Sequence, residues 1–254
     1  MVALLREEEL ARLARLRRLK PWQEEKRYVQ ALIMYAVSEW PLVMKGGTYL
    51  WFFHGLSRFS EDLDYTAVGR VDADRVEEVA EVLRLFGVAS AVKVLKDDEC
   101  TLTVRVAARG PLFKSEKDTC YVRLDISRRE KPLLKPTPVR LDEPHYGIPL
   151  VYIRGMDLQE VLAEKLRAVY VRSDPRDAYD AWHLCARLGV PLDPGLLERK
   201  LSFYGAGLDP EKLLAAIRAA GRSWGRLKPL VFGALPDYSE VEQALARCIA
   251  RQAG

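Results

Sequence analysis

The sequence lacks asparagine altogether and has only three histidines and four cysteines among its 254 residues. No histidines stand at metal-ligand spacing and no C-x-x-C pair occurs, which argues against a zinc enzyme and against a disulfide framework. We expect the cysteines to be ordinary reduced thiols. The absence of asparagine, an amide that deamidates when hot, favours a thermophilic source.

Long hydrophobic runs are also missing. No stretch approaches the roughly 18 apolar residues that span a bilayer. The first residues are rich in Arg and Glu and lack the apolar run of a signal peptide. We therefore expect a cytoplasmic protein without a membrane partner. The net charge of +4 neither requires nor excludes a nucleic-acid partner.

The helix and strand patterns divide the chain into three segments: N-terminal helices at 1–40, broken near Pro21, a mixed core at 41–150 and a helical C-terminal domain at 151–254. In the core, a short helix is expected at 48–54 and a longer one from a cap at Asp72 to Phe86. Residues 131–149 hold five prolines and read as a loop. Strands are expected at 42–44, 63–68, 89–95, 101–107 and 120–127. These patterns predict an α+β fold, a mixed sheet with flanking helices followed by a helical domain.

Two glycines and two aspartates make the first chemical pattern. Gly46 and Gly47 precede Thr48 and a short helix, so backbone N–H groups can approach an anion closely. Asp62 and Asp64 lie two residues apart at the start of a strand, so their carboxylates share one face. Such a pair repels unless a cation lies between the two groups, and Mg²⁺ or Mn²⁺ takes oxygens of this kind together with substrate phosphates.

A third carboxylate, Asp125, lies on the later strand, on the face opposite Leu124 and Ile126. If that strand neighbours the one carrying Asp62 and Asp64, the three can hold two metal ions for phosphoryl transfer. Taken singly, each feature has an ordinary interpretation, because D-x-D pairs, Gly-Gly turns and exposed strand aspartates are common. The combination in this order carries the prediction.

The helical segment adds charged residues on inward faces. Lys165 falls within the stripe formed by Leu162, Leu166 and Val169, which is costly unless its amine meets an anion such as a triphosphate. Asp177 and Asp180 also face inward, where they can bind a cation or pair with Lys165 or Arg176. For Asp177, capping or structural pairing stays open beside a catalytic role, and for Asp180 the structural interpretation is favoured.

Two further residues precede the aspartates. Arg58 can reach a phosphate or be a solvated surface residue, and Ser60 can contact phosphate or cap a turn. The phosphate-binding set that we expect is Gly46, Gly47, Thr48, Arg58, Ser60, Lys165 and Arg176.

This order of motifs resembles the DNA polymerase β-type nucleotidyltransferase superfamily. More closely, Lys45-Gly46-Gly47-Thr48, the run from Arg58 to Asp64 and Leu124-Asp125-Ile126-Ser127 are similar to the AbiEii family of abortive-infection toxins, which includes the MenT toxins. Glu164-Lys165-Leu166-Arg167-Ala168 and Arg176-Asp177-Ala178-Tyr179-Asp180 resemble that family's helical motifs. Tyr49 and Ala181 depart from its usual residues.

The resemblance implies a nucleotidyltransferase-type sheet, catalytic roles for Asp62, Asp64, Asp125, Lys165 and Asp177, and a nucleoside triphosphate as substrate. It further implies the toxin of a type IV toxin–antitoxin pair, an antitoxin protein as partner and an RNA acceptor at the 3′ end of tRNA. Two alternatives remain: transfer to a small molecule or protein, or a non-catalytic regulator that binds nucleotide or RNA.

Overall fold

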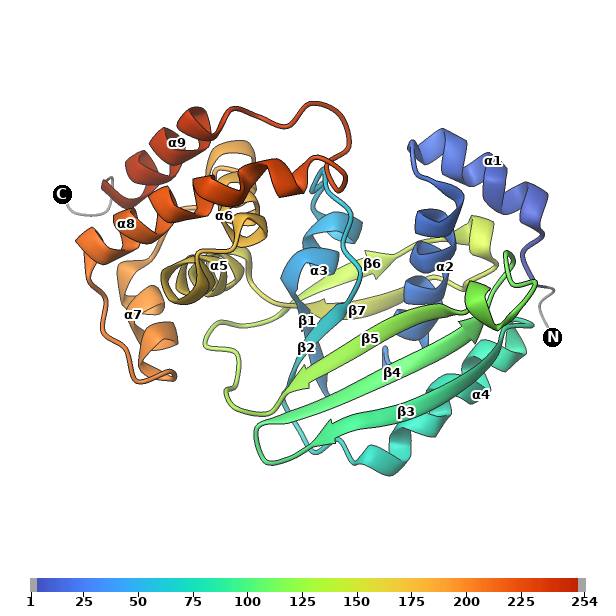
Figure 1. Ribbon diagram of the computed structural model, residues 1–254. Helices are drawn as coiled ribbons and strands as arrows, with labels where there is room; N and C mark the ends of the chain where they lie inside the picture. Colours follow the sequence, from blue (N-terminus) through green and yellow to red (C-terminus); the bar gives the residue numbers. More distant parts are fainter. Residues whose placement is uncertain (1–3, 251–254) are drawn as a thin grey trace. The chain divides into compact units, whose positions relative to one another are not determined.

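The computed structural model of the protein, which describes residues 4–250, contains a seven-stranded sheet (Figure 1). Buried and exposed residues alternate along β4 and β5, whereas β1 is almost continuously buried. The strand order is β3-β4-β5-β2-β1-β7-β6. The β2–β5 and β1–β7 pairs are parallel and the other pairs are antiparallel, so the sheet is mixed. The strands are β1 (Leu42–Lys45), β2 (Leu63–Ala67), β3 (Ala89–Asp97), β4 (Thr101–Arg109), β5 (Cys120–Ser127), β6 (Thr137–Leu141) and β7 (Val151–Gly155).

The chain divides into two compact units. Within the described residues, the sheet unit comprises 4–49, Glu61–Lys131 and Pro136–Gly155. The helical unit comprises Leu50–Ser60, Pro132–Lys135 and 156–250. Helix α3 (Gly46–Phe53) begins in the sheet unit and ends in the helical unit. The N-terminal helices therefore belong to the same unit as the sheet.

Three helices of the sheet unit are α1 (Glu7–Arg17), α2 (Pro21–Ala36) and α4 (Glu77–Leu85). Helix α2 contacts β5 and α4 contacts β3, so these helices cover one face of that part of the sheet. On this face the alternate β4 residues Leu102, Val104 and Val106 are completely buried. Their neighbours on the opposite face are half-buried or exposed, as expected for a strand with one solvated side.

The helical unit contains α5 (Leu158–Arg172), α6 (Pro175–Trp182), α7 (Pro194–Ser202), α8 (Pro210–Ala220) and α9 (Tyr238–Ala250). Helix α5 contacts α6, α7 and α8 (Figure 1). Helices α6, α7 and α8 each begin with an Asp-Pro pair, in which the aspartate caps backbone N–H groups and proline occupies the first helical position. No helix within residues 4–250 combines the length and the apolar character needed to cross a membrane.

The α+β prediction is confirmed, and the expected strands and helices outside residues 131–149 are found within a few residues of their predicted bounds. The interpretation of 131–149 as a loop is wrong, because β6 runs from Thr137 to Leu141 within it. Strand β6 ends the sheet order, and an edge strand tolerates Pro138 because one of its sides makes no ladder hydrogen bonds. Asp72 occupies the expected N-cap position, but its carboxylate pairs with Arg70 and makes no cap bond.

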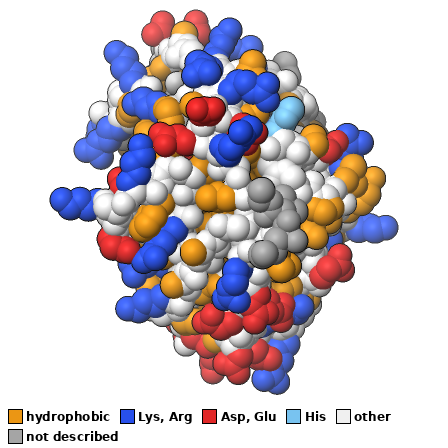
Figure 2. All heavy atoms as spheres, turned by 90° about the vertical axis from the view of Figure 1, so that its right-hand side faces the viewer, with side chains coloured by type: hydrophobic (Ala, Val, Ile, Leu, Met, Phe, Trp, Pro, Cys, Tyr) orange, Lys and Arg blue, Asp and Glu red, His pale blue; other side chains and the backbone are white. Residues whose placement is uncertain are grey.

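Basic, acidic and hydrophobic side chains all lie on the face shown in Figure 2, and acidic groups gather at its lower end. Part of the basic character of α1 is neutralised locally. Arg17 pairs with Glu24 and with Glu143 at 2.6 Å, and Arg6 pairs with Glu9 at 2.8 Å. Part of the positive charge of the N-terminal segment is therefore neutralised by ion pairs within the protein.

Candidate active site

The strand register brings the predicted carboxylates together at one place on the sheet. Asp62 lies immediately before β2 and Asp64 lies within it. Strand β5 is the parallel neighbour of β2, and Asp125 is directly opposite Asp64. The expectation that the two strands are adjacent is confirmed. Residues directly opposite each other project from the same face, so Asp64 and Asp125 form a carboxylate row on β2 and β5.

The Gly-Gly-Thr segment supports this row from β1 and α3. Gly46 has φ of +77°, and a Cβ added there would lie 2.3 Å from Oδ2 of Asp64, so only glycine fits. Gly47 is buried in the first turn of α3. The buried Thr48 hydroxyl donates a hydrogen bond to the backbone carbonyl of Asp62. The described contact of Thr48 thus fixes the start of β2.

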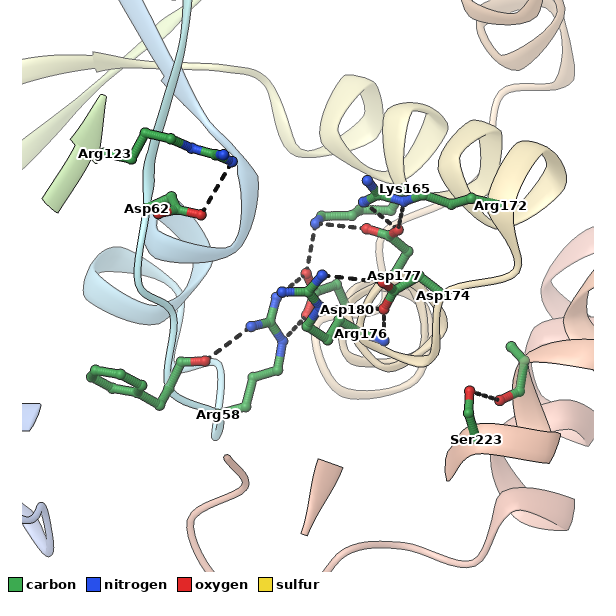
Figure 3. A network of polar contacts seen from close by, with 12 residues as sticks. Arg58, Asp62, Arg123, Lys165, Arg172, Asp174, Arg176, Asp177, Asp180 and Ser223 are labelled. Atoms are coloured by element: carbon green, nitrogen blue, oxygen red, sulfur yellow. Dashed lines mark hydrogen bonds and ion pairs between the residues drawn. The ribbon is translucent and has the colours of Figure 1, made fainter. Parts of the chain in front are cut away.

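Arg123, two residues before Asp125 on the same face of β5, links two of the carboxylates. Its Nε lies 2.7 Å from Oδ2 of Asp125, and its NH2 lies 3.4 Å from Oδ2 of Asp62 (Figure 3). The hydroxyl of Thr103 donates to Oδ1 of Asp125 at 2.7 Å. The alternation of β5 places Arg123 beside Asp125, but sequence reasoning gave it no role.

Asp62 titrates in a crowded electrostatic environment. Burial raises its pKa above the ordinary value; Arg123 and Lys26 oppose this effect, and Asp125 and Glu61 add to it. Lys26 is held near by an ion pair to Glu61 at 2.9 Å.

Across the part of the chain that the structure describes, no three His, Cys, Asp or Glu side chains stand in metal-binding arrangement. Arg123 lies between Asp62 and Asp125 instead, and provides the positive charge there.

A second charged network lies in the helical unit. Asp180 accepts two 2.6 Å hydrogen bonds from Arg58, through Nε and NH2, and its Oδ2 lies 2.7 Å from Nζ of Lys165. Asp177 pairs with Lys165 at 3.1 Å and with Arg172 at 2.5 Å (Figure 3). Of the alternatives that the sequence left open for the inward aspartates, the structure shows pairing with Lys165. Arg58 is buried, so its described partner is a carboxylate of the chain itself.

For both Lys165 and Asp180, the effect of ion pairing on the pKa is larger than the opposite effect of burial. Burial alone would lower the pKa of Lys165, but Asp180 and Asp177 raise it above its ordinary value. Burial alone would raise the pKa of Asp180, but Arg58 and Lys165 lower it. Lys165 and Asp180 are therefore charged near neutral pH. In this network three cationic side chains, Arg58, Lys165 and Arg172, face two carboxylates.

Two predicted residues remain, Arg176 and Ser60. Arg176 donates through its backbone N–H and its side chain to Asp174, the N-cap residue of α6. Asp177 is therefore not the capping residue of α6. Ser60 is half-buried at the end of Leu50–Ser60.

The mixed sheet agrees with the class that a matching family model gives this protein, a nucleotidyltransferase. More specifically, the chain belongs to the family described as nucleotidyl transferase AbiEii toxin of type IV toxin–antitoxin systems, whose model matches residues 29–247. Membership in that family implies a nucleoside triphosphate as substrate and an antitoxin as partner.

Solved structures share the fold at low sequence identity. MenT4, the nucleotidyltransferase toxin Rv2826c from Mycobacterium tuberculosis H37Rv, is 23% identical, with a TM-score of 0.70 over 98% of this chain and 90% of that one. JHP933 from Helicobacter pylori is 19% identical, with a TM-score of 0.63 over 92% of each chain. Comparison with curated proteins gives no match.

Proposed function

We propose that the protein transfers a nucleotide from a nucleoside triphosphate to the 3′ hydroxyl of an RNA, with tRNA as the acceptor, and that Asp62, Asp64 and Asp125 hold the divalent metal ions of the reaction. The observation that carries this proposal is the register of Asp64 with Asp125 on parallel neighbouring strands, with Asp62 beside them.

The donor set fits Mg²⁺ or Mn²⁺, because it consists of carboxylate oxygens on a rigid strand edge. The raised pKa of Asp62, caused by burial and by its acidic neighbours, indicates negative charge in need of a cation. Arg123 supplies part of the positive charge that these carboxylates need. It would have to move from between Asp62 and Asp125 for all three aspartates to bind metal. Bound metal would favour ionisation of the attacking hydroxyl and neutralise charge on the leaving pyrophosphate.

Other side chains of the protein orient the aspartates and neutralise the charge of the triphosphate. Gly46 allows Asp64 to lie against the backbone, and Thr48 fixes Asp62 through its carbonyl. For Lys165 we propose contact with the triphosphate, supported by the surplus of cations around it. Asp177 positions the Lys165 amine. Arg172 and Arg176, with half-exposed side chains, are available for further contacts with the phosphates.

The test is incubation with each α-³²P nucleoside triphosphate, total RNA and either Mg²⁺, Mn²⁺ or EDTA. The matched control is the Asp62→Ala/Asp64→Ala variant, checked for folding by circular dichroism. We expect label in tRNA-sized RNA with the wild type and metal only. Label on protein or on a small molecule would replace the RNA acceptor, and transfer that persists in the variant would contradict the roles of the aspartates.

A further inference from the structure

The face of β3, β4 and β5 that α2 and α4 leave uncovered continues directly from the carboxylate row. Residues opposite one another in the register lie side by side on that face. Thr103, Asp125 and Asp64 form the first row, and Arg105 and Arg123 are paired in the row two residues along the strands. The rows are about 7 Å apart, since a strand advances about 3.4 Å per residue.

The second row is positively charged across three strands. Lys93 on β3 pairs with Arg105 on β4, which pairs with Arg123 on β5. All three are exposed. We call Lys93, Arg105 and Arg123 the cation row. Among the described residues, neither Lys93 nor Arg105 has a carboxylate within ion-pair distance, whereas Arg123 is bound to Asp125 and Asp62.

The third row makes a hollow beside an aromatic ring. Ala91, Ala107 and Tyr121 are opposite one another on the three strands, and the two alanines leave space next to the tyrosine. The hollow measures about 220 Å³, with Arg109 and Glu116 at its rim paired to each other. Tyr121 is 49% exposed, and the guanidinium of Arg105 lies 5.3 Å from the centre of its ring. We call this the Tyr121 hollow.

We propose that this face binds the single-stranded 3′ end of the RNA acceptor, with its phosphates on the cation row and one base in the Tyr121 hollow. The proposal rests on the RNA acceptor of the proposed function. The acceptor hydroxyl must reach the carboxylate row, so the preceding nucleotides must cross neighbouring surface. The rows that follow offer what a single strand needs, namely cations for phosphates and an aromatic face for stacking.

Charge complementarity and rigidity favour RNA over an acidic peptide. Neighbouring strands lie about 4.8 Å apart, so the cation row extends over about 10 Å of fixed backbone. A flexible acidic side chain gains little from the adjoining aromatic hollow. A nucleotide can use both features at once, because its base and its phosphate lie on opposite sides of one sugar.

The test measures binding without chemistry. A short 5′-fluorescein-labelled single-stranded RNA with a free 3′ hydroxyl is titrated by anisotropy across a salt series, without triphosphate or metal. The variants are Lys93→Ala/Arg105→Ala, Tyr121→Ala and Tyr121→Phe. The control is Arg12→Ala/Arg84→Ala, which removes two exposed cations from α1 and α4. Circular dichroism and thermal melting check the fold of each.

We expect Lys93→Ala/Arg105→Ala to weaken binding by on the order of tenfold and to flatten the log–log salt slope by about 1.4, since each lost single-strand phosphate contact removes about 0.7. Tyr121→Ala should weaken binding about fivefold or more, whereas Tyr121→Phe should stay within about twofold because it keeps the ring. Excess polyglutamate should displace the RNA from neither the wild type nor Tyr121→Phe.

Three results would overturn the proposal: unchanged affinity and slope in Lys93→Ala/Arg105→Ala, an equal loss in the control, or displacement by polyglutamate. If the wild type binds RNA tightly and these variants do too, only this surface is wrong. If the wild type binds no RNA even at low salt, the RNA acceptor of the proposed function fails as well.

Discussion

The two charged clusters of this protein use the same residue types for different purposes. In the sheet unit, the side chains of Asp62 and Asp125 remain 42% and 24% exposed, and their described cationic partner is the half-exposed Arg123. In the helical unit, the side chains of Asp180 and Asp177 are 0% and 2% exposed and are held by Arg58, Lys165 and Arg172. The carboxylates on β2 and β5 stay partly open to solvent, as the proposed metal-binding role requires, whereas the carboxylates between helices are buried and paired with cations of the chain.

The largest expected effect separates chemistry from folding. Asp64→Asn and Asp125→Asn keep the side-chain size but remove a proposed metal ligand, so transfer should fall by on the order of a thousandfold or more. Their melting temperatures should change little. Asp72→Asn, an exposed change in the same unit, is the control and should keep full activity. Single-turnover rates with labelled triphosphate give the answer, and an active Asp64→Asn would contradict the site.

Asp180→Asn should act through stability instead. It removes the carboxylate to which the buried Arg58 donates two hydrogen bonds. Breaking a buried pair in this way lowers the free energy of unfolding by about 3–5 kcal/mol. Urea denaturation measures the loss. An Asp180→Asn protein as stable as the wild type would mean that the buried network contributes nothing to the fold.

Gly46→Ala should damage both properties. The residue would be strained at φ of +77° by about 1–3 kcal/mol, and its Cβ would push the Asp64 carboxylate away. Gly55→Ala is a matched control, because Gly55 has φ of +66° but nothing within 4 Å of an added Cβ. Both variants should lose stability. Only Gly46→Ala should also lose transfer activity, because only there does the added Cβ displace the Asp64 carboxylate. Equal activities would argue against the tight approach of Gly46 to Asp64.

The smallest expected effect is a pH dependence in the helical unit. Burial, with a smaller contribution from His183, lowers the pKa of His54 to about 4. Between this value and about 6.5 the unfolded chain binds the extra proton, so stability should rise with pH across that window. Because solvent screens this partly exposed ring, we expect a rise on the order of 1–2 kcal/mol, less than the full pKa difference would give. His54→Phe should flatten this part of the profile, as measured by urea midpoints from acid to neutral pH. An unchanged profile would show that His54 is not its source.

The sequence predicted the elements whose pattern is local. Strand β5 follows from strict alternation, the break between α1 and α2 from Pro21, and the inward Lys165 from its place among leucines. Strand β6 was missed because its pairing with β7 comes from a partner distant from the local proline signals. The register that places Asp125 opposite Asp64 depends on strand pairing across about sixty residues, which periodicity alone cannot fix.

The partners of the site residues were harder to predict than their positions. Arg58 and Arg123 are both arginines near aspartates in the chain, yet one is buried against Asp180 and the other bridges Asp62 and Asp125. A contact such as Arg58 with Asp180 joins residues 122 positions apart, so no local pattern contains it. Burial decides which arginine is structural, and burial is a property of the folded chain.

The most direct test of this account is Mn²⁺ binding, followed by electron paramagnetic resonance with a non-hydrolysable triphosphate analogue. The proteins compared are the wild type, Asp64→Asn and Asp177→Asn, each checked for folding. The account predicts that Asp64→Asn binds Mn²⁺ at least tenfold more weakly while Asp177→Asn binds it like the wild type. Normal binding by Asp64→Asn together with lost binding by Asp177→Asn would contradict it, because the metal would then belong to the helical unit.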